Sequence, residues 1–368
     1  MMRGIYFHIP FCNEKCPYCD FYSVSADEDL KETYVTAVSK QIQAYAGKNL
    51  QIDTVYFGGG TPSLMESRQL LRLINSAKAV FDIAPNAEIT LEANPADVSE
   101  KWFAELRAGG FNRVSIGMQS ANEAELRLLG RRHSRADVEK AVYAAKSAGI
   151  ENLSLDLMLA LPNMTEKTLQ TSIDFAASLP IQHVSAYLLK VEKGTPFYDI
   201  REQLYTEEDT EAAQYLYAVK ALEEEGFCQY EISNFAKPGY EGRHNLHYWR
   251  CEEYLGFGPG AHSFFRGKRF YYPRDIREFI TGNEPMQDGN GGGFEEYAML
   301  SLRLREGITR EQAVRRFSDE GSVKFEEMLR NVGKCPRSYV ESDENRICLT
   351  AEGFAVSNAV ILRLLGEG

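Results

Sequence analysis

The sequence HIPFCNEKCPYCDF runs from His8 to Phe21 and contains three cysteines, Cys12, Cys16 and Cys19, spaced C-x3-C-x2-C. Three thiolates on one short loop can ligate three irons of a [4Fe–4S] cluster and leave the fourth iron open to a small chelating molecule. Structural zinc instead takes four ligands, usually from paired C-x2-C units. The chain has no second C-x2-C and no histidine close after Cys19. The spacing therefore favours an iron–sulfur cluster over a zinc site.

Composition restricts the class of protein. The chain has 368 residues, with ordinary apolar and charged fractions, so it can bury a large core. Its net charge of −12 argues against broad binding to nucleic acid or anionic membranes. No apolar run is long enough to span a bilayer, and no signal peptide is apparent at the start, which leaves only peripheral membrane association open. We expect a cytoplasmic protein with reduced cysteines. The remaining cysteines lack metal spacing, and we expect buried bystander thiols at Cys228, Cys251, Cys335 and Cys348.

Strand-like and amphipathic helical segments alternate through the first part of the chain. Strands are expected at residues 4–9, 53–57, 88–92, 113–117, 152–157 and 183–188. Helices are expected at residues 28–45, 67–81, 100–108, 123–129, 135–148 and 166–177. This repetition predicts an α/β fold with a parallel sheet and helical crossovers. Six units suit a partial (β/α)6 TIM-type barrel, which we place at residues 1–225 together with a long helix at 207–225.

The later part of the chain has a different pattern. Residues 229–280 are irregular and aromatic-rich, and we treat 226–288 as a segment packed on the barrel. A glycine-rich stretch at 288–293 resembles a linker. Helices and a strand pair then predict a small winged-helix-like α+β domain at 294–368. Such domains often bind DNA, but this one is not basic enough to favour that role.

Polar residues and glycines follow the expected strands at one edge of the sheet. In a parallel barrel the active site lies at the carboxyl ends of the strands. Those ends carry the cysteine loop, the glycine turn GGGTP at 58–62, and Glu92, Gln119, Asp156 and Tyr187. A glycine turn lets the backbone approach a ligand closely. Alone it is a weak signal, but beside the cysteine loop it suggests a binding site.

In radical S-adenosylmethionine (SAM) enzymes, the molecule that takes the open iron is SAM, bound through its amino and carboxylate groups. The glycine turn would then receive the amino group of SAM. Glu92, Gln119, Arg131 and Asp156 can supply hydrogen bonds to the ribose, the amino group and the carboxylate.

Longer motifs extend this likeness to a family. They are YxHIPFC from Tyr6, GGGTPS from Gly58, EANP from Glu92, SIGMQS from Ser115, LGRRH from Leu129, DLM from Asp156, HNLHYW from His244 and YLGFGPGAH from Tyr254. In this order they resemble the anaerobic coproporphyrinogen oxidase-like branch of radical SAM proteins over essentially the whole chain. The resemblance implies a partial (β/α)6 barrel, a [4Fe–4S]–SAM site with Cys12, Cys16 and Cys19 as ligands, and a small C-terminal domain. It also implies SAM contacts at Tyr6, Tyr18, Gly59, Gly60, Thr61, Glu92, Gln119, Arg131 and Asp156.

Two features separate the haem-chaperone members of this branch from the true oxidases. The oxidases carry a further cysteine two residues after the third, where this chain has Phe21, and a longer N-terminal extension. The chaperones carry an HNxxYW motif, implicated in haem binding, which HNLHYW matches. The resemblance makes His244 the candidate axial haem ligand, with His247 a weaker second candidate. From chemistry alone, a core histidine is the better interpretation of His244.

We therefore expect a haem chaperone that keeps a [4Fe–4S] cluster and a SAM site, receives electrons from a donor, and delivers haem to an unidentified acceptor protein. The alternative is an oxygen-independent coproporphyrinogen III oxidase, which would convert propionates to vinyl groups. Basic residues between Lys237 and Arg277 could pair with haem propionates or form an ordinary solvated surface. One departure from the family is Ala160, where glycine is more usual before Leu-Pro.

Overall fold

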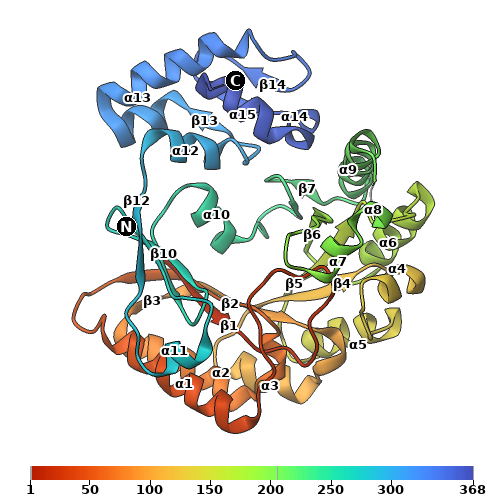
Figure 1. Cartoon of the computed structure of the whole chain (residues 1–368), viewed down its shortest axis with the longest axis vertical. Helices are drawn as coiled ribbons and strands as arrows, with labels where there is room; N and C mark the ends of the chain where they lie inside the picture. The colour runs from red at the N-terminus through yellow and green to blue at the C-terminus, as the bar shows by residue number, and fades with distance from the viewer. Residues whose placement is uncertain (1, 205, 368) are drawn as a thin grey trace.

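A computed structural model describes residues 2–204 and 206–367. Within these residues a mixed sheet runs in the order β12-β11-β10-β9-β1-β2-β3-β4-β5-β6-β8-β7 (Figure 1). The six central strands are parallel neighbours: β1 (Arg3–Ile9), β2 (Gln51–Gly59), β3 (Asp82–Ala93), β4 (Arg113–Gln119), β5 (Asn152–Leu159) and β6 (His183–Leu188). Helices connect them: α1 (Glu28–Gln43), α2 (Ser67–Val80), α3 (Glu100–Ala108), α4 (Glu123–Leu128), α5 (Arg135–Ser147) and α6 (Glu166–Ser178). The six predicted units are thus confirmed, with bounds that shift by a few residues.

The barrel does not close. At one edge, β1 pairs in parallel with β9 (Tyr254–Phe257), and at the other edge β6 pairs in antiparallel fashion with β8 (Asn234–Ala236). Because β1 and β6 pair with these strands and not with each other, the sheet stays an open, partial barrel, as predicted.

Alternation along the strands divides apolar from polar side chains. On β1, Ile5 and Phe7 are buried in a cluster with residues of α1 and α2, whereas Tyr6 lies on the opposite face and stacks on Tyr56 of β2 (ring centroids 6.2 Å apart). Residues two apart in a strand share a face, so the same alternation continues around the barrel. Glu92 of β3 accepts a hydrogen bond from Tyr56 and so lies on the Tyr6 side. The outer face therefore packs against helices, and the inner face carries polar groups.

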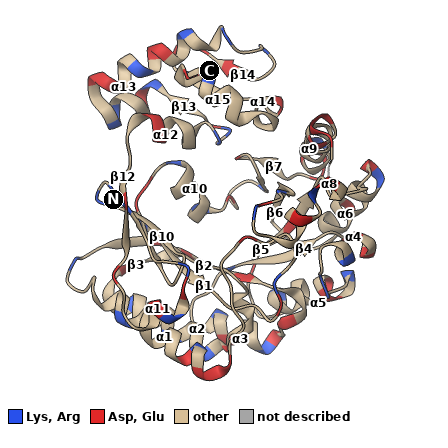
Figure 2. Ribbon diagram, in the orientation of Figure 1, with Lys and Arg blue, Asp and Glu red and all other residues tan. Residues whose placement is uncertain are grey.

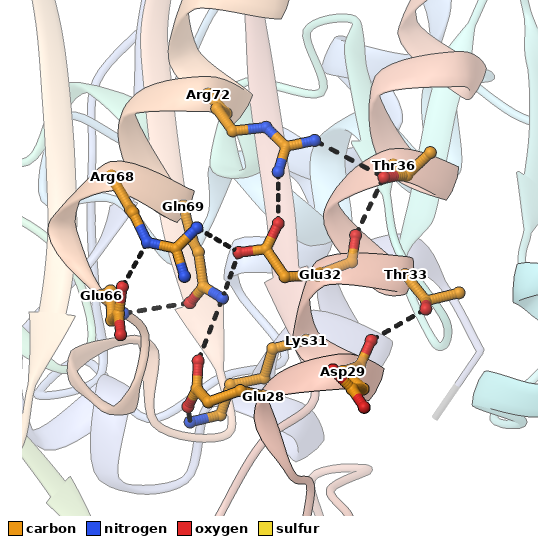
Figure 3. Close-up of polar contacts among 10 residues, drawn as sticks. All are labelled: Glu28, Asp29, Lys31, Glu32, Thr33, Thr36, Glu66, Arg68, Gln69 and Arg72. Carbon is orange, nitrogen blue, oxygen red and sulfur yellow. Dashed lines mark hydrogen bonds and ion pairs between the residues drawn. The ribbon is translucent and has the colours of Figure 1, made fainter.

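The outer helices are joined by a polar network between α1 and α2 (Figure 3). Glu32 accepts hydrogen bonds from Arg68 (2.7 Å) and from Gln69 (2.9 Å), and it also pairs with Arg72. Gln69 is fully buried, and its Oε1 accepts from the backbone N–H of Glu66 at the start of α2 (3.1 Å). Exposed ion pairs contribute little to stability, about 0–1 kcal/mol each. The hydrogen bond from the buried Gln69 amide to Glu32 is therefore the stronger link between α1 and α2.

The segment predicted to be irregular, 229–280, is instead mostly regular structure. It contains part of β7 (Cys228–Gln229), with β8, β9, β10 (His262–Phe265), β11 (Lys268–Tyr271), α10 (Arg243–Trp249) and α11 (Ile276–Ile280). The predicted linker is also partly a strand, β12 (Met286–Asn290). These strands are two to five residues long and pair with distant segments. Local periodicity is too short in them to be recognised.

The C-terminal part forms a small α+β module with a three-stranded antiparallel sheet in the order β13-β15-β14. Its elements are α12 (Phe294–Ser301), β13 (Ile308–Thr309), α13 (Arg310–Val332), β14 (Val340–Ser342), β15 (Arg346–Leu349), α14 (Ala351–Ala355) and α15 (Ser357–Leu365). The helix α13 has a break at Ser318, whose φ is +54°. The helix and strand order is that of the predicted winged-helix-like domain.

The remaining helices are α7 (Pro196–Asp199), α8 (Arg201–Leu204) and α9 (Glu208–Glu224). In Figure 1 the blue C-terminal module lies at one end of the molecule, and α10 lies between it and the barrel. Lysine and arginine are interspersed with acidic residues along the outer helices (Figure 2). None of the helices in the described part of the chain has the length and apolar character needed to cross a membrane.

Candidate cofactor site at the carboxyl ends of the strands

The cysteine loop leaves the carboxyl end of β1 and is closed at its base. The Cys12 N–H donates to Val24 O (3.1 Å), and the Val24 N–H donates to Pro10 O (2.7 Å). Within the loop, the Cys19 N–H donates to Cys16 O (3.1 Å). These bonds hold all three predicted cluster cysteines in one closed loop over the end of the sheet.

The three thiols do not converge as ligands of a single ion would. Within the described residues, no three His, Cys, Asp or Glu side chains are grouped closely enough to hold one metal ion. A [4Fe–4S] cluster makes a different demand, because each thiolate binds a separate iron at a separate corner of the cluster. Cys12, Cys16 and Cys19 are each partly exposed and carry no disulfide. The assignment of these three cysteines as cluster ligands stays a prediction.

The glycine turn after β2 packs directly on the cysteine loop. The Gly60 N–H donates to Ile9 O (2.8 Å) and the Thr61 N–H donates to Phe11 O (2.7 Å). The Thr61 hydroxyl lies 3.3 Å from the Cys12 thiol. A Cβ on Gly60 would lie 2.7 Å from Phe11 O and 2.8 Å from Ile9 O, closer than real Cβ atoms approach. Only glycine permits this contact between the two loops.

Glu92 lies beneath the glycine turn at the end of β3. Its carboxylate accepts hydrogen bonds from the Tyr56 hydroxyl (2.8 Å) and from the Gly59 N–H (3.2 Å). Burial and, to a smaller extent, the nearby negative charge of Asp156 raise the pKa of Glu92 to about 7, although these two hydrogen bonds act to lower it. Removal from water makes the ionised Glu92 carboxylate unfavourable unless a positive charge lies beside it. A cationic ligand would therefore bind favourably here.

Asp156 faces the same lumen from β5. It accepts a hydrogen bond from the Ser115 hydroxyl (2.8 Å), and burial raises its pKa to about 6. Glu92 and Asp156 are therefore two half-buried acids of like charge, and the negative charge of Asp156 makes ionisation of Glu92 less favourable. SAM carries a sulfonium and an amino group, which are the kind of charge that such a pair accommodates.

Gln119 and Arg131 lie close together beside β4, because a Cβ on Gly117 would lie 3.0 Å from Gln119 Nε2 and 3.9 Å from Arg131 Nη1. The Arg131 guanidinium donates to the Tyr18 hydroxyl (2.8 and 3.1 Å). Gln119 ends β4 with a left-handed backbone (φ +66°), and its buried Oε1 has no hydrogen-bond partner among the described residues. Strained backbones and unpaired buried polar atoms are common where a ligand binds. The amide and the guanidinium therefore fit the polar ligand predicted from the sequence.

His244 lies away from this rim. It is almost fully buried (1% exposed), and its ring nitrogens are hydrogen-bonded to the hydroxyls of Thr54 (2.9 Å) and Tyr248 (2.7 Å). Its ring stacks on Tyr56 (centroids 5.1 Å apart) and lies 6.4 Å from the ring of Tyr6. Burial holds the pKa of His244 well below its usual range. In this conformation neither nitrogen is open to an iron.

His247 lies in a different environment. It is hydrogen-bonded to Asp53 (2.8 Å) and paired with Glu252 (2.5 Å). Burial would lower its pKa, but these two carboxylates outweigh burial and raise the pKa to about 9. A protonated imidazole has no lone pair for a metal, so His247 is an ion-paired structural residue here.

The basic residues of the 237–277 segment are largely neutralised within the chain. Arg243 pairs with Asp53 (3.1 Å), and Arg250 with Glu306 (2.9 Å). Arg269 pairs with Glu296 (2.5 Å). Arg274 has the longest of these contacts, 3.5 Å to Asp20, and its side chain stays 58% exposed.

Sequence reasoning did not single out Tyr56, Ser115 or Arg113. Tyr56 and Ser115 each hold a predicted acid in place, and Arg113 is a buried cation whose charge lowers the pKa values of Glu92 and Asp156. The sequence did contain an indication of their role. Each of the three lies an even number of residues from a predicted site residue on its own strand, or opposite one on the neighbouring strand, and so shares its face of the sheet. The departure at Ala160 also has a structural consequence. Its φ is +56°, a conformation that costs a non-glycine residue about 1–2 kcal/mol.

The cysteine loop generates the first prediction. Replacing Cys12, Cys16 and Cys19 together by Ala should abolish the iron–sulfur absorbance of anaerobically reconstituted protein, while the circular dichroism spectrum stays unchanged. The thiols lie on a surface loop outside the core, so their loss need not unfold the chain. Iron and sulfide analysis that still finds about four irons per chain in the triple variant would contradict the assignment.

The contact between Gly60 and the cysteine loop generates the second prediction. Gly60→Ala must push the cysteine loop and the glycine turn apart, because the clashing atoms are backbone. We expect SAM affinity of the reconstituted protein, measured by equilibrium dialysis, to fall by roughly tenfold or more. Gly293→Ala is the matched control, since its Cβ would meet no atom within 4 Å and its φ is −68°. Equal affinities in the two variants would show that the close approach is unimportant for binding.

The third prediction concerns pH. Because the folded chain keeps a proton on Glu92 up to about pH 7, while an unfolded glutamate loses it near 4.5, Glu92 should lower stability as pH rises between those values. Glu92→Gln should remove this part of the decrease in the free energy of unfolding, on the order of 2 kcal/mol between the two pH values. The free energy is measured by urea unfolding of cluster-free protein. Glu139→Gln, at an exposed position on α5, should follow the wild-type curve. Parallel curves for Glu92→Gln and wild type would refute the raised pKa.

Known proteins resemble this chain in sequence and in fold. The model of the Radical SAM superfamily matches residues 6–176. The chain is 33% identical to the Heme chaperone HemW of Bacillus subtilis, with 100% of both chains covered, and 32% identical to that of Lactococcus lactis, with 99% and 97% covered. Among solved structures, coproporphyrinogen III oxidase (HemN) of Escherichia coli matches with a TM-score of 0.82, covering 99% of this chain and 90% of that one at 20% identity, which establishes the common fold. The chain therefore belongs to the radical SAM superfamily and, within it, to the family of the haem chaperone HemW.

Proposed function

We propose that this protein is a haem chaperone that binds haem and delivers it to an acceptor protein, and that it holds a [4Fe–4S] cluster and SAM. The observation that carries the proposal is the similarity to curated haem chaperones along the full length of the chain. The HNLHYW helix and Phe21, in place of the additional cysteine of the oxidases, support the same assignment.

The residues at the carboxyl ends of the strands fit both cofactors. Cys12, Cys16 and Cys19 would ligate the cluster, and the site formed by the glycine turn, Glu92 and Asp156 would bind SAM. The cluster, when bound, supplies single electrons to the SAM on its open iron. The chain's own residues orient this ligand: Gly59 and Tyr56 fix the Glu92 carboxylate, while Gln119 offers an unpaired amide oxygen.

The family resemblance makes His244 the haem ligand, and the geometry sets a condition on that assignment. Iron ligation by His244 requires loss of the hydrogen bond to Tyr248 or Thr54 and access of the iron to a ring that is now 1% exposed. The assignment stays a prediction, and it requires α10 to move from its place against β1 and β2.

The alternative function, coproporphyrinogen III oxidation, has the support of a common fold alone. The two functions differ in what they do to a tetrapyrrole. The oxidase removes carbon dioxide from propionates and changes the porphyrin, whereas the chaperone returns the same haem that it received.

This difference defines the fourth prediction. Reconstituted protein should bind about one haem per chain and give it up to apomyoglobin, used as a haem acceptor, with the released haem unchanged by mass spectrometry. With coproporphyrinogen III, SAM and a reductant under anaerobic conditions, no vinyl product should form. Formation of protoporphyrinogen on the order of once per second would overturn the chaperone assignment in favour of the oxidase.

A further inference from the structure

Arg113, the first residue of β4, is a buried cation without a counter-ion. The residue is 4% exposed, and its Nε has no hydrogen-bond partner among the described residues. No carboxylate of the described chain forms an ion pair with its guanidinium. Arg131, by contrast, donates two hydrogen bonds to the Tyr18 hydroxyl. A charge that is removed from water and left unpaired lowers stability, so the position of Arg113 calls for a partner from outside the chain.

Two side chains beside Arg113 also have buried polar atoms without partners. Register places Thr90 of β3 and Asn152 of β5 on either side of Arg113, so the three side chains lie on one face of the sheet. That face is the lumen, because Glu92 follows Thr90 by two residues on β3. Thr90 Oγ1 and Asn152 Oδ1 are buried, and neither has a hydrogen-bond partner among the described residues. Buried polar groups are nearly always hydrogen-bonded, so adjacent exceptions mark a place where a ligand or water binds.

A cavity opens beside this group at the amino ends of the strands. It has a volume of about 370 Å³, and its wall includes Asn112, Asn152, Glu241 and Arg243. Asn152 therefore belongs both to the cavity wall and to the group around Arg113. Between Glu241 and Arg243 lies Gly242, where an added Cβ would be 3.6 Å from Arg113 Nη2. The guanidinium lies one layer behind the cavity wall, against the backbone that leads into α10.

The acids near the cavity already have donors. The Glu88 carboxylate accepts hydrogen bonds from the backbone N–H groups of Arg243 and His244, both at 3.1 Å. Glu241 accepts from a backbone N–H of its own loop (3.3 Å). These bonds turn both carboxylates towards backbone donors and leave Arg113 without a partner.

Arg113 also lies close to the helix that carries HNLHYW. Gly242 directly precedes α10, and His244 follows it by two residues. Burial is the main cause of the low pKa of His244, and the positive charge of Arg113 lowers that pKa further. A haem has its iron at the centre of the porphyrin and its propionates at one edge. An arginine near a histidine that binds the iron is therefore well placed to pair with a propionate.

A carboxylate is the ligand that fits this group. A guanidinium binds a carboxylate through a fork of two hydrogen bonds. The Thr90 hydroxyl can donate a further hydrogen bond to the same group, and the Asn152 amide can donate through its Nδ2. A phosphate carries up to two charges, whereas this group offers one cation. The carboxylate of SAM is not required here, because Gln119 lies at the other end of β4, roughly 20 Å away.

We propose that Arg113, assisted by Thr90 and Asn152, binds a carboxylate of a ligand that reaches the barrel through the cavity at its amino end. This inference rests on the proposed haem-binding function, under which the carboxylate is a haem propionate. Arg113 would then hold the propionate while the candidate ligand His244 meets the iron. Both residues become accessible when α10 moves from this end of the barrel.

The first test uses propionate ion as the probe and needs no haem. Cluster-free, full-length wild-type protein should unfold at a higher temperature in about 100 mM sodium propionate than in sodium chloride of the same ionic strength. Arg113→Met removes the charge and keeps an extended side chain, so this variant should show no such difference. Arg127→Met makes the same change at a position on α4 that is 72% exposed, and it should behave like wild type.

Stability separates a ligand-binding arginine from a structural one. Because Arg113 is unpaired in the ligand-free protein, Arg113→Met should leave the free energy of unfolding unchanged or raise it. The measurement is urea unfolding at pH 5, where the pKa values of Glu92 (about 7) and Asp156 (about 6) keep both acids largely protonated. Thr90→Val removes the unpartnered hydroxyl at nearly constant shape and should behave in the same way. Clear destabilisation by both replacements would show that these groups support the fold, and would overturn the proposal.

The second test identifies the source of the carboxylate by titration of reconstituted protein, followed by the Soret band. Wild type should bind haem roughly tenfold more tightly than haem dimethyl ester, which has no propionate charge. Arg113→Met should reduce the affinity for haem to that for the ester and leave the affinity for the ester unchanged. Arg113→Lys keeps the charge but loses the fork of donors, so its affinity for haem should fall between the two.

The outcomes separate this inference from the proposed function. If haem and its ester bind alike to wild type and to Arg113→Met, and propionate has no effect on unfolding, only water occupies the group and the inference fails while the haem-binding function stands. If propionate stabilises wild type but not Arg113→Met, and no haem binds, the carboxylate site stands and the proposed function fails.

Discussion

The cofactor site depends on one close approach of two backbones. The Gly60 and Thr61 N–H groups donate to carbonyls at the end of β1 and at the start of the cysteine loop, and no side chain stands between them. This contact places the thiols over the sheet. It also positions Gly59, whose N–H holds the carboxylate of Glu92. Both sides of the site, the cysteine loop and the acids beneath it, are therefore positioned by a contact that a Cβ atom on Gly60 would prevent.

The polar lumen is the second constraint. A closed TIM barrel fills its interior with branched apolar side chains. Here the inner face instead carries hydroxyls, Glu92 and Asp156, and burial raises the pKa values of both acids. Such groups lower stability unless a ligand or counter-charge compensates them. The open sheet admits that ligand at the carboxyl ends, where Gln119 also keeps an unpaired oxygen.

The HNLHYW helix is coupled to this lumen whether or not it binds iron. His244 lies between Thr54 and Tyr248, and it stacks on Tyr56, whose hydroxyl in turn holds Glu92. Substitutions in this motif can therefore disturb Glu92, the acid that we propose for SAM binding, through packing alone. A haem effect seen in such variants needs a cluster and SAM measurement beside it before it is attributed to ligation.

The order of six strand–helix units, the cysteine loop and the glycine turn were all determined by the sequence alone, because the patterns that encode them are local. Hydrophobic alternation and capping residues mark β6 (His183–Leu188) and α3 (Glu100–Ala108) to the residue. Only the tertiary structure decided the extension of the sheet through β8–β12, the Tyr56 bond to Glu92, and the burial of His244. Those features arise when distant segments meet: Gly4 and Tyr254 pair in register between β1 and β9, and the side chains of Thr54 and His244 form a hydrogen bond. Whether a polar side chain is buried depends on which distant segments pack against it, and no local sequence pattern encodes that.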